Sequence, residues 1–386
     1  MLTAAHIEAI AANVLSAQML TPWVVSFLVC LALVLLTPAL IKLVARREDV
    51  NAVQAAHSRP TLRIGGLGIL LGVLAGTLAL SFDPEFLSYA SLLLVSAIPL
   101  ILAGFAEDLG FGVPPKLRLG AIALSALLCS SFLPATVSSL GVLGVDALLA
   151  FYPLALLFTI FAASGVTNAF NLIDGLNGLA SFTAVTTSVA LSALALIAGL
   201  DHLQTFYGMF AVVTLGFFIL NYPLGRLFLG DGGAYLLGHC LVWGGVTLAN
   251  QVSGLSPFAI LLIFFWPIAD TALAIWRRAR LSNPADRPDR LHFHQLVMRF
   301  LEIRVLGRNR RTVANPLATL IIAPLIVAPQ ICGLLFAFEH ASAILASVLF
   351  SIIFFATYIL GMRLARRSHV AMHQQATNDA QKAGNP

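Results

Sequence analysis

Charged residues are scarce in this chain, and their scarcity excludes the largest class of proteins. Only 10% of the 386 residues are Asp, Glu, Lys or Arg, whereas 59% are hydrophobic. Soluble domains carry roughly a quarter charged residues. The mean hydropathy of +0.93 is also far too apolar for a disordered chain. The composition therefore excludes a soluble enzyme and indicates repeated membrane spans.

Cysteine is scarce as well. The four cysteines, Cys30, Cys129, Cys240 and Cys332, lie far apart in apolar runs and form no CxxC pair. We interpret them as lipid-facing or core-facing thiols, which excludes a disulfide or metal framework. The first twenty residues lack the basic segment of a cleaved signal peptide, so we expect the first span to be retained.

Long apolar runs fill most of the chain. A bilayer core needs roughly 20 apolar residues as helix. We therefore predict an all-α polytopic membrane protein with about eleven transmembrane helices. The sixth and seventh are separated only by Asp201 and His202. The predicted spans are 20–45, 64–82, 86–106, 117–134, 146–167, 179–200, 203–221, 233–250, 255–276, 313–338 and 341–362.

The charges orient these spans. If eleven spans alternate with the N-terminus outside, the basic residues fall on the inner side and the outer segments hold only acidic ones: Glu8, Asp83, Glu85, Asp146, Asp201 and Glu339. The positive-inside rule thus predicts a cytoplasmic C-terminus. We expect residues 1–367 to form one integral-membrane catalytic domain with its active site on cytoplasmic loops. Residues 368–386 are predicted to be a polar, disordered tail.

Polar residues other than Lys and Arg also gather on the inner side, in five loops. In the first loop, Arg59 and Arg63 can meet a phosphate, and Gly65 and Gly66 allow close backbone approach to a ligand. Taken alone, this loop is better explained as a basic membrane anchor that follows the positive-inside rule and contains a Pro-Gly turn.

The second loop begins with Glu107 and Asp108 and continues to Lys116 and Arg118. Two adjacent carboxylates repel each other, so a divalent cation, or a raised pKa that makes one of them a base, would relieve the repulsion. A solvated helix end with charges facing water explains the pair equally well.

The third loop has the most specific pattern. Asn168, Asn171, Asp174 and Asn177 recur at a spacing of three, which places them on one side of a helix end. Amides can read a sugar or a base edge, and the carboxylate can meet a metal ion or a hydroxyl. Helix capping accounts for one or two of these residues but not for four in register.

The fourth loop runs from Phe228 to Gly233. Asp231 lies in a Gly-rich turn before a helix N-terminus, where it can bind Mg²⁺ while the glycines leave room for phosphate oxygens. Phe228 can stack on a base. For this motif in isolation, an N-cap Asp is the better interpretation.

The fifth loop contains Arg290, His292 and His294. On an extended backbone the two histidines face one way, with Arg290 beside them to grip a diphosphate. Zinc is a weak alternative because the loop has no Cys and no HExxH spacing.

Taken together, these motifs resemble the polyprenyl-phosphate N-acetylhexosamine-1-phosphate transferases, a membrane family that includes the peptidoglycan translocase and the enzymes that initiate O-antigen and teichoic acid synthesis. The resemblance runs in order over residues 49–296. It is carried by Asp49, Asn51, His57, Pro60, Arg63, Gly65 and Gly66, then by Glu107-Asp108, Asn168 to Gly178, Phe228 to Asp231, and Asp289 to Gln295.

Three positions depart from the family pattern. Glu107 replaces the usual first Asp, Gln295 stands where a third His is common, and Gln54-Ala55 replaces a frequent Arg-Lys pair. The Glu107 carboxylate lies one methylene further out, so we expect Glu107 and Asp108 to be inequivalent.

The resemblance implies transfer of a sugar 1-phosphate from a UDP-N-acetylhexosamine to undecaprenyl phosphate with release of UMP. The product would be the first lipid-linked intermediate of a cell-surface polysaccharide, made at the bacterial inner membrane. Mg²⁺ is the implied cofactor, with Mn²⁺ as its alternative. Eleven spans favour the O-antigen and teichoic acid branch over the peptidoglycan phospho-MurNAc-pentapeptide translocase. The implied partners are these two substrates and membrane lipids, without nucleic acid; a homodimer is left open.

By the same resemblance, the catalytic residues are Glu107, Asp108, Asp174 and Asp231, and the metal ligands are Asp231, Glu107 and Asp108. The substrate-binding residues are Arg63, Lys116, Arg118, Asn168, Asn171, Asn177, Phe228, Arg290, His292 and His294. Phe228 would lie near uracil, and Arg290 with the two histidines would grip the diphosphate or the sugar.

A secondary transporter is the distant alternative. Its coupling residues should lie near mid-membrane. Apart from Lys42, Arg118 and Asp146, which lie at the ends of predicted spans, only Asp270 and His239 lie within the spans, and Asp270 is near the inner end.

Overall fold

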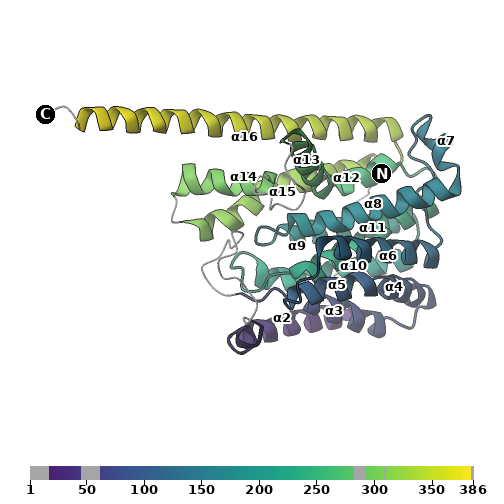
Figure 1. Cartoon of the computed structure of the whole chain (residues 1–386). Coiled ribbons are helices and arrows are strands. Elements are labelled where there is room, and N and C mark those ends of the chain that lie inside the picture. The colour runs from purple at the N-terminus through teal and green to yellow at the C-terminus, as the bar shows by residue number, and fades with distance from the viewer. Residues whose placement is uncertain (1–16, 45–60, 282–291, 308–309, 384–386) are drawn as a thin grey trace.

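The computed structural model describes residues 17–44, 61–281, 292–307 and 310–383. Within these ranges the chain forms helices and no strands, which confirms the all-α class. The helices lie side by side, with α16 along the top of the view and α2 and α3 at the bottom (Figure 1). Their bounds are α2 Ala17–Val44, α3 Gly66–Ala79, α4 Pro84–Ser96, α5 Ile98–Asp108, α6 Pro115–Phe132, α7 Val145–Leu149, α8 Tyr152–Ile173, α9 Leu179–Ile197, α10 Asp201–Asn221, α11 Gly230–Gln251, α12 Pro257–Ile263, α13 Phe265–Leu281, α14 Phe293–Phe300, the π-helix η1 Leu301–Leu306, α15 Arg311–Leu335 and α16 His340–Ala383.

Seven of the described helices are long and apolar enough to cross a membrane, namely α2, α8, α9, α10, α11, α15 and α16. Two bent pairs raise the number to nine: α4 with α5, bent by 50°, and α12 with α13, bent by 82°. The two remaining predicted spans coincide with α3, which has 14 residues, and with α6. The structure therefore confirms a multi-pass helical protein, and eleven spans stay a prediction.

Helix boundaries differ from the predicted ones around the third polar loop. The predicted span 146–167 is wrong at both ends, because residues 145–149 form the separate short helix α7 and α8 continues to Ile173. Asn168 and Asn171 therefore lie in the last turns of α8, beyond the predicted end of the span and at the helix end that their spacing predicted. Their spacing of three keeps both side chains on one face, so they do not interrupt the helix. The break between α9 and α10 lies at residues 198–200, slightly before the predicted break, so Asp201 and His202 are the first two residues of α10.

The end of the chain also differs from the expectation of a disordered tail after residue 368. Helix α16 continues past Ser368 to Ala383. Most of this segment is Ala, Gln, Met and other residues that favour helix, so the segment can extend a helix that the membrane span has already nucleated.

Helix α11 is the centre of the bundle. Every residue from Gly230 to Leu248 is buried. Its glycines allow neighbouring backbones to approach closely: a Cβ on Gly66 of α3 would lie 2.2 Å from the Cα of Gly233, and a Cβ on Gly104 of α5 would lie 2.5 Å from the Cα of Gly232. Small residues at helix crossings are typical of membrane bundles. These crossings fix the start of α11 against α3 and α5.

Candidate active site

Asp108 joins the end of α5 to the start of α11. Its Oδ1 accepts a hydrogen bond from the backbone N–H of Asp231 at 2.7 Å, and its Oδ2 accepts one from Gly232 at 2.9 Å. The side chain is buried. A carboxylate in this position satisfies free N–H groups of the first helical turn and opposes the positive end of the helix dipole. Asp108 therefore sets the position of Asp231, and only the second lone pair of each oxygen remains for another ligand.

Asp231 is the meeting point of three helices. One carboxylate oxygen, Oδ2, pairs with the Nη1 of Arg118 from α6, and the other, Oδ1, accepts a hydrogen bond from the Nδ2 of Asn171 on α8 at 3.0 Å. The sequence predicted all three residues for the site, and the structure brings them into contact. A buried carboxylate with a cationic and an amide partner is well suited to phosphate chemistry, because both partners can also bind phosphate oxygens.

Asp174 follows the last residue of α8 and lies near the same cluster. Desolvation raises the pKa of its carboxyl well above the usual range; the negative charges of Asp231 and Asp108 raise it further, while Arg63 lowers it. Asp174 therefore retains a proton more readily than an ordinary carboxyl.

Glu107 has a different environment from its neighbour. Its Oε2 accepts a hydrogen bond from the backbone N–H of Val113 at 2.6 Å, across the turn that leads into α6. This contact holds the start of the helix that carries Lys116 and Arg118. Lys116 itself is exposed at the first turn of α6. Glu107 and Asp108 are thus inequivalent, as expected: Glu107 binds a backbone N–H before α6, whereas Asp108 binds two backbone N–H groups of α11.

The segment before α11 is held against the segment before α3. The backbone N–H of Phe228 donates to the carbonyl of Leu62 at 2.9 Å, and the N–H of Gly65 donates to the carbonyl of Phe228 at 2.8 Å. Gly230 has a φ of +78°, and a Cβ there would lie 2.0 Å from the carbonyl oxygen of Arg63. The glycine therefore allows the Arg63 backbone to approach the start of α11. The side chain of Phe228, two residues earlier, is half-buried.

Two of the predicted amides behave differently from Asn171. Asn177 is buried; its Nδ2 donates to the carbonyl of Pro223 at 2.9 Å, and its backbone N–H donates to the Oδ1 of Asn315 at 2.7 Å. It fastens the loop after α8 to α15 and to the segment before α11, rather than contacting Asp231. Asn168 is half-buried on α8, one turn before Asn171.

A second polar cluster joins α13 to the start of α14. Asp270 Oδ2 lies 3.1 Å from His292 Nδ1 and 3.0 Å from His294 Nδ1, and its Oδ1 accepts the backbone N–H of Phe293 at 2.8 Å. The three side chains are buried. The predicted Arg290 lies outside the described residues, as do Asp49, Asn51, His57 and Arg59.

His294 connects the two clusters. A Cβ on Gly175 would lie 2.6 Å from its Nε2, and Gly175 directly follows Asp174. Four of the five predicted loops are thus represented around Asp231 and Asp174, and the fifth, around His294, packs against the same segment.

Sequence reasoning missed two residues at these clusters. Asp270 was noted only as an acidic residue within a span, because 22 residues of sequence separate it from His292 and no local pattern joins them. Tyr235 lies one helical turn after Asp231, is buried, and is electrostatically coupled to Asp231 and Arg118. Its spacing of four from Asp231 was the available signal.

The carboxylates of the first cluster are chemically suited to a divalent cation, and a bound Mg²⁺ is part of the function proposed below. Asp231, Asp174 and Asp108 supply oxygen ligands of the kind that Mg²⁺ prefers, and their mutual repulsion would be relieved by a cation. Asp231 and Asp108 are two of the three ligands that the family resemblance implies, and Asp174 is a further candidate. The third implied ligand, Glu107, accepts the backbone N–H of Val113 with its Oε2.

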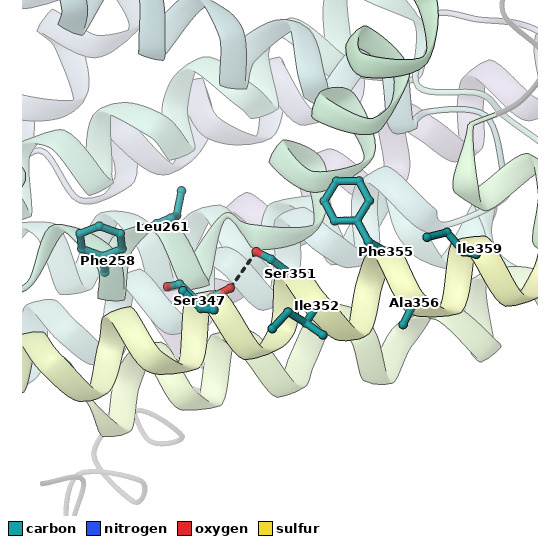
Figure 2. Close-up of a pocket in the computed structure, with 9 residues that line it drawn as sticks. Phe258, Leu261, Ser347, Ser351, Ile352, Phe355, Ala356 and Ile359 are labelled. Atoms are coloured by element: carbon teal, nitrogen blue, oxygen red, sulfur yellow. Dashed lines mark hydrogen bonds between the residues drawn. The ribbon is translucent and has the colours of Figure 1, made fainter. Parts of the chain in front are cut away.

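A separate apolar hollow of about 590 Å³ lies between α12 and α16 (Figure 2). The hydroxyl of Ser351 points along the helix and donates to the carbonyl of Ser347 at 2.7 Å. None of the residues that line the hollow carries a charge. The hollow therefore does not contribute to the polar chemistry described above.

The fold and this site define a class: a polytopic membrane protein with a carboxylate and arginine cluster where its helices end. A family model described as glycosyl transferase family 4 matches residues 90–249. The chain is 31% identical over 287 residues to the probable undecaprenyl-phosphate N-acetylglucosaminyl 1-phosphate transferase of Bacillus subtilis (strain 168), over 72% of this chain and 77% of the relative.

Two further relatives agree. The decaprenyl-phosphate N-acetylglucosaminephosphotransferase of Mycobacterium leprae (strain TN) is 30% identical over 67% of this chain and 70% of its own length. The undecaprenyl-phosphate alpha-N-acetylglucosaminyl 1-phosphate transferase of Escherichia coli (strain K12) is 27% identical over 61% of this chain and 65% of its own length. The chain belongs to glycosyl transferase family 4 and is a transferase. This confirms the family that the motifs resemble.

Proposed function

We propose that this protein transfers N-acetylglucosamine 1-phosphate from a UDP-sugar to undecaprenyl phosphate and releases UMP. The names of the relatives support the polyprenyl phosphate acceptor and the N-acetylglucosamine phosphate group. In this reaction an oxygen of the lipid phosphate bonds to the sugar-bearing phosphorus. The bond from that phosphorus to the bridging oxygen of UMP breaks, so the products are a lipid diphosphate sugar and UMP.

The observation that carries this proposal is the convergence on Asp231 of Arg118 and Asn171, beside Asp174. Phosphoryl transfer depends mainly on positioning and on neutralising charge, and both require polar groups held rigidly. Asp108 and the glycine crossings provide that rigidity, because they fix the first turn of α11.

Each residue then has a role that follows from its position. Arg118 and Arg63 offer positive charge to the phosphates, and Asn171 orients the Asp231 carboxylate. The carboxylate form of Asp174 can accept a proton from the lipid phosphate, and its raised pKa favours holding that proton afterwards. A bound Mg²⁺ would supply further positive charge to the phosphate oxygens, and Asp231 would be its principal ligand.

The same proposal includes the placement in the membrane. We propose eleven spans, with α3 and α6 completing the nine that meet the length and composition criteria, an outer N-terminus and a cytoplasmic site in a bacterial inner membrane. The one-sided charge distribution supports this orientation. A lipid acceptor and a water-soluble nucleotide sugar can meet only at such a membrane boundary.

The direct experiment is to incubate the purified protein with undecaprenyl phosphate and a panel of UDP-sugars in the presence of Mg²⁺, and to measure UMP. UMP release with UDP-N-acetylglucosamine that depends on the lipid phosphate is the expected result. UMP release with none of the UDP-sugars, from protein that is folded and monodisperse, would refute the proposal.

A further inference from the structure

The second polar cluster contains a carboxylate that the proposed mechanism does not use. Asp270 is completely buried, and one of its oxygens, Oδ2, lies within 3.1 Å of the Nδ1 atoms of both His292 and His294. Its other oxygen accepts the N–H of Phe293, between the two histidines. The Asp270 carboxylate thus contacts three consecutive residues: the side chains of His292 and His294 and the backbone N–H of Phe293.

These contacts determine the tautomer of both rings. An ionised carboxylate only accepts hydrogen bonds, so the Nδ1 atom of each imidazole must carry a proton. In a neutral ring of this tautomer, Nε2 is an acceptor. His294 has no exposed surface, and burying its ring as a cation with an N–H that lacks an acceptor would be costly.

The Nε2 of His294 is buried and has no hydrogen-bond partner among the described residues. It faces Gly175, where a Cβ would lie 2.6 Å away, and it therefore lies against the loop that begins with Asp174. Buried polar atoms of native proteins are usually paired, so an unpaired acceptor beside a substrate site indicates that a ligand supplies the missing donor.

Aromatic packing also fixes the backbone that carries the His294 ring. Phe293 stacks on Phe354 of α16 with ring centroids 4.9 Å apart and packs edge-on against Trp266 of α13 at 5.6 Å. The aromatic contacts fix the backbone between the two histidines, while Asp270 fixes the rotation of their rings. The pair is therefore preorganised.

A metal site is the competing interpretation, since the ligand atoms of Asp270, His292 and His294 lie within 4.8 Å of one another. The distances favour hydrogen bonds. Both oxygen–nitrogen separations lie in the N–H···O range, and the second carboxylate oxygen is already engaged by a backbone N–H.

We propose that Asp270 is a positioning residue that holds His294 with Nδ1 protonated, so that its Nε2 accepts a hydrogen bond from an O–H or N–H group of the bound nucleotide sugar. This inference rests on the proposed function for the identity of the ligand. In this role, His294 is neutral and accepts a hydrogen bond from a hydroxyl or amide group of the ligand. It does not bind the diphosphate as a cation.

The first test compares Asp270→Asn with Thr271→Val, a change at the next residue of the same helix, in the purified full-length enzyme. In asparagine one of the two carboxylate positions becomes an amide donor, so either the two Nδ1–H groups or the Phe293 N–H lose their acceptor, and the negative charge is lost as well. We expect KM for UDP-N-acetylglucosamine to rise by about tenfold, the effect of losing one buried hydrogen bond, with a smaller change in kcat. Thr271→Val should retain the wild-type KM.

The second test does not depend on activity. In ¹⁵N-histidine NMR spectra of the full-length protein, with His294→Gln identifying the signal, wild-type His294 should show a protonated Nδ1 and an unprotonated Nε2. Asp270→Asn should lose that signature. A doubly protonated His294 in the wild type, or a signature unchanged in Asp270→Asn, would overturn the inference.

A third comparison moves the ring without touching Asp270. Gly175→Ala places a methyl group against His294 Nε2, whereas Gly165→Ala on α8 has open space around the added methyl group. Gly175→Ala should raise KM, and Gly165→Ala should not.

Stoichiometric zinc that disappears in Asp270→Asn would instead establish the metal site. If wild-type enzyme transfers no sugar phosphate, the proposed function fails; if it does and Asp270→Asn keeps wild-type KM, only the inference fails.

Discussion

Arg118 in the first turns of α6 forms an ion pair with Asp231 in the first turn of α11, although 113 residues separate them in the sequence. Both residues are mostly enclosed, so the pair is poorly screened by solvent. Asp108 and Glu107, from the end of α5, hold the two helix starts that carry the pair. This arrangement explains why chemistry-bearing residues from separate loops can act together.

Removing the positive member of the pair should weaken binding of the nucleotide sugar. We expect Arg118→Gln to lower kcat/KM by about 100-fold, because the phosphates lose a charge-assisted partner and Asp231 loses its counter-ion. The matched control is Arg226→Gln, an exposed arginine in the segment before α11. UMP release measures both variants, and equal activities would remove Arg118 from the site.

The two adjacent acids should respond differently to loss of charge. Glu107→Gln keeps an oxygen that can accept the Val113 N–H, whereas Asp108→Asn has one acceptor for the two N–H groups of α11. We expect Asp108→Asn to lower kcat/KM by about 100-fold and Glu107→Gln by about tenfold or less. A larger loss in Glu107→Gln, at equal thermal stability, would show that the charge of Glu107 carries the chemistry.

We expect Asp174 to lower the thermal stability of the folded protein at high pH and to be required for transfer activity. Its raised pKa means that the folded state binds a proton more tightly than the unfolded chain, so stability falls as the pH rises from the unfolded pKa through the folded one. In EDTA, Asp174→Asn should therefore have a Tm about 2 °C or more above wild type at pH 8, with a smaller difference at pH 5. Its transfer activity should be lost. A mutant Tm below wild type at pH 8 would contradict the repulsion described here.

The glycine crossings predict a packing defect. Gly66→Ala would place a methyl group 2.2 Å from the Cα of Gly233, so α3 must move away from α11 at a cost of about 1–3 kcal/mol. The control is Gly120→Ala on α6, where nothing lies within 4 Å of the added methyl group. Thermal unfolding in detergent should show a lower Tm for Gly66→Ala only, and a Tm equal to the control would refute the close packing.

The apolar runs of the sequence predicted the class of fold well, because a membrane helix is defined by length and composition alone. Helix ends were harder. The spacing of Asn168 and Asn171 correctly placed them on one side of a helix end, but the apolar run stops at residue 167, whereas α8 continues to Ile173. Bends such as the 82° turn between α12 and α13 leave no periodic signal.

The site was predictable where the residues lie in short motifs, as for Asp231 and Asn171. Their partners depend on helix packing, which no local pattern encodes. Asp270 illustrates the limit: its role becomes visible only when α13 is placed beside His292 and His294. The glycines after Phe228 are a second example. The sequence suggested that they leave room for phosphate oxygens, whereas in the structure Gly232 and Gly233 lie where α11 crosses α5 and α3.

Transfer of a sugar 1-phosphate, rather than of a sugar, is the central claim, and the destination of the β-phosphorus of the donor tests it. Purified protein in liposomes that contain undecaprenyl phosphate is given Mg²⁺ and UDP-N-acetylglucosamine labelled at the β-phosphorus, with Asp231→Asn as the inactive variant and Asp201→Asn, an exposed residue at the start of α10, as the control. The account predicts that the label enters the lipid and that unlabelled UMP is released, at a rate at least about 1,000-fold lower in Asp231→Asn. Label that remains in released UDP, or full activity of Asp231→Asn, would contradict it.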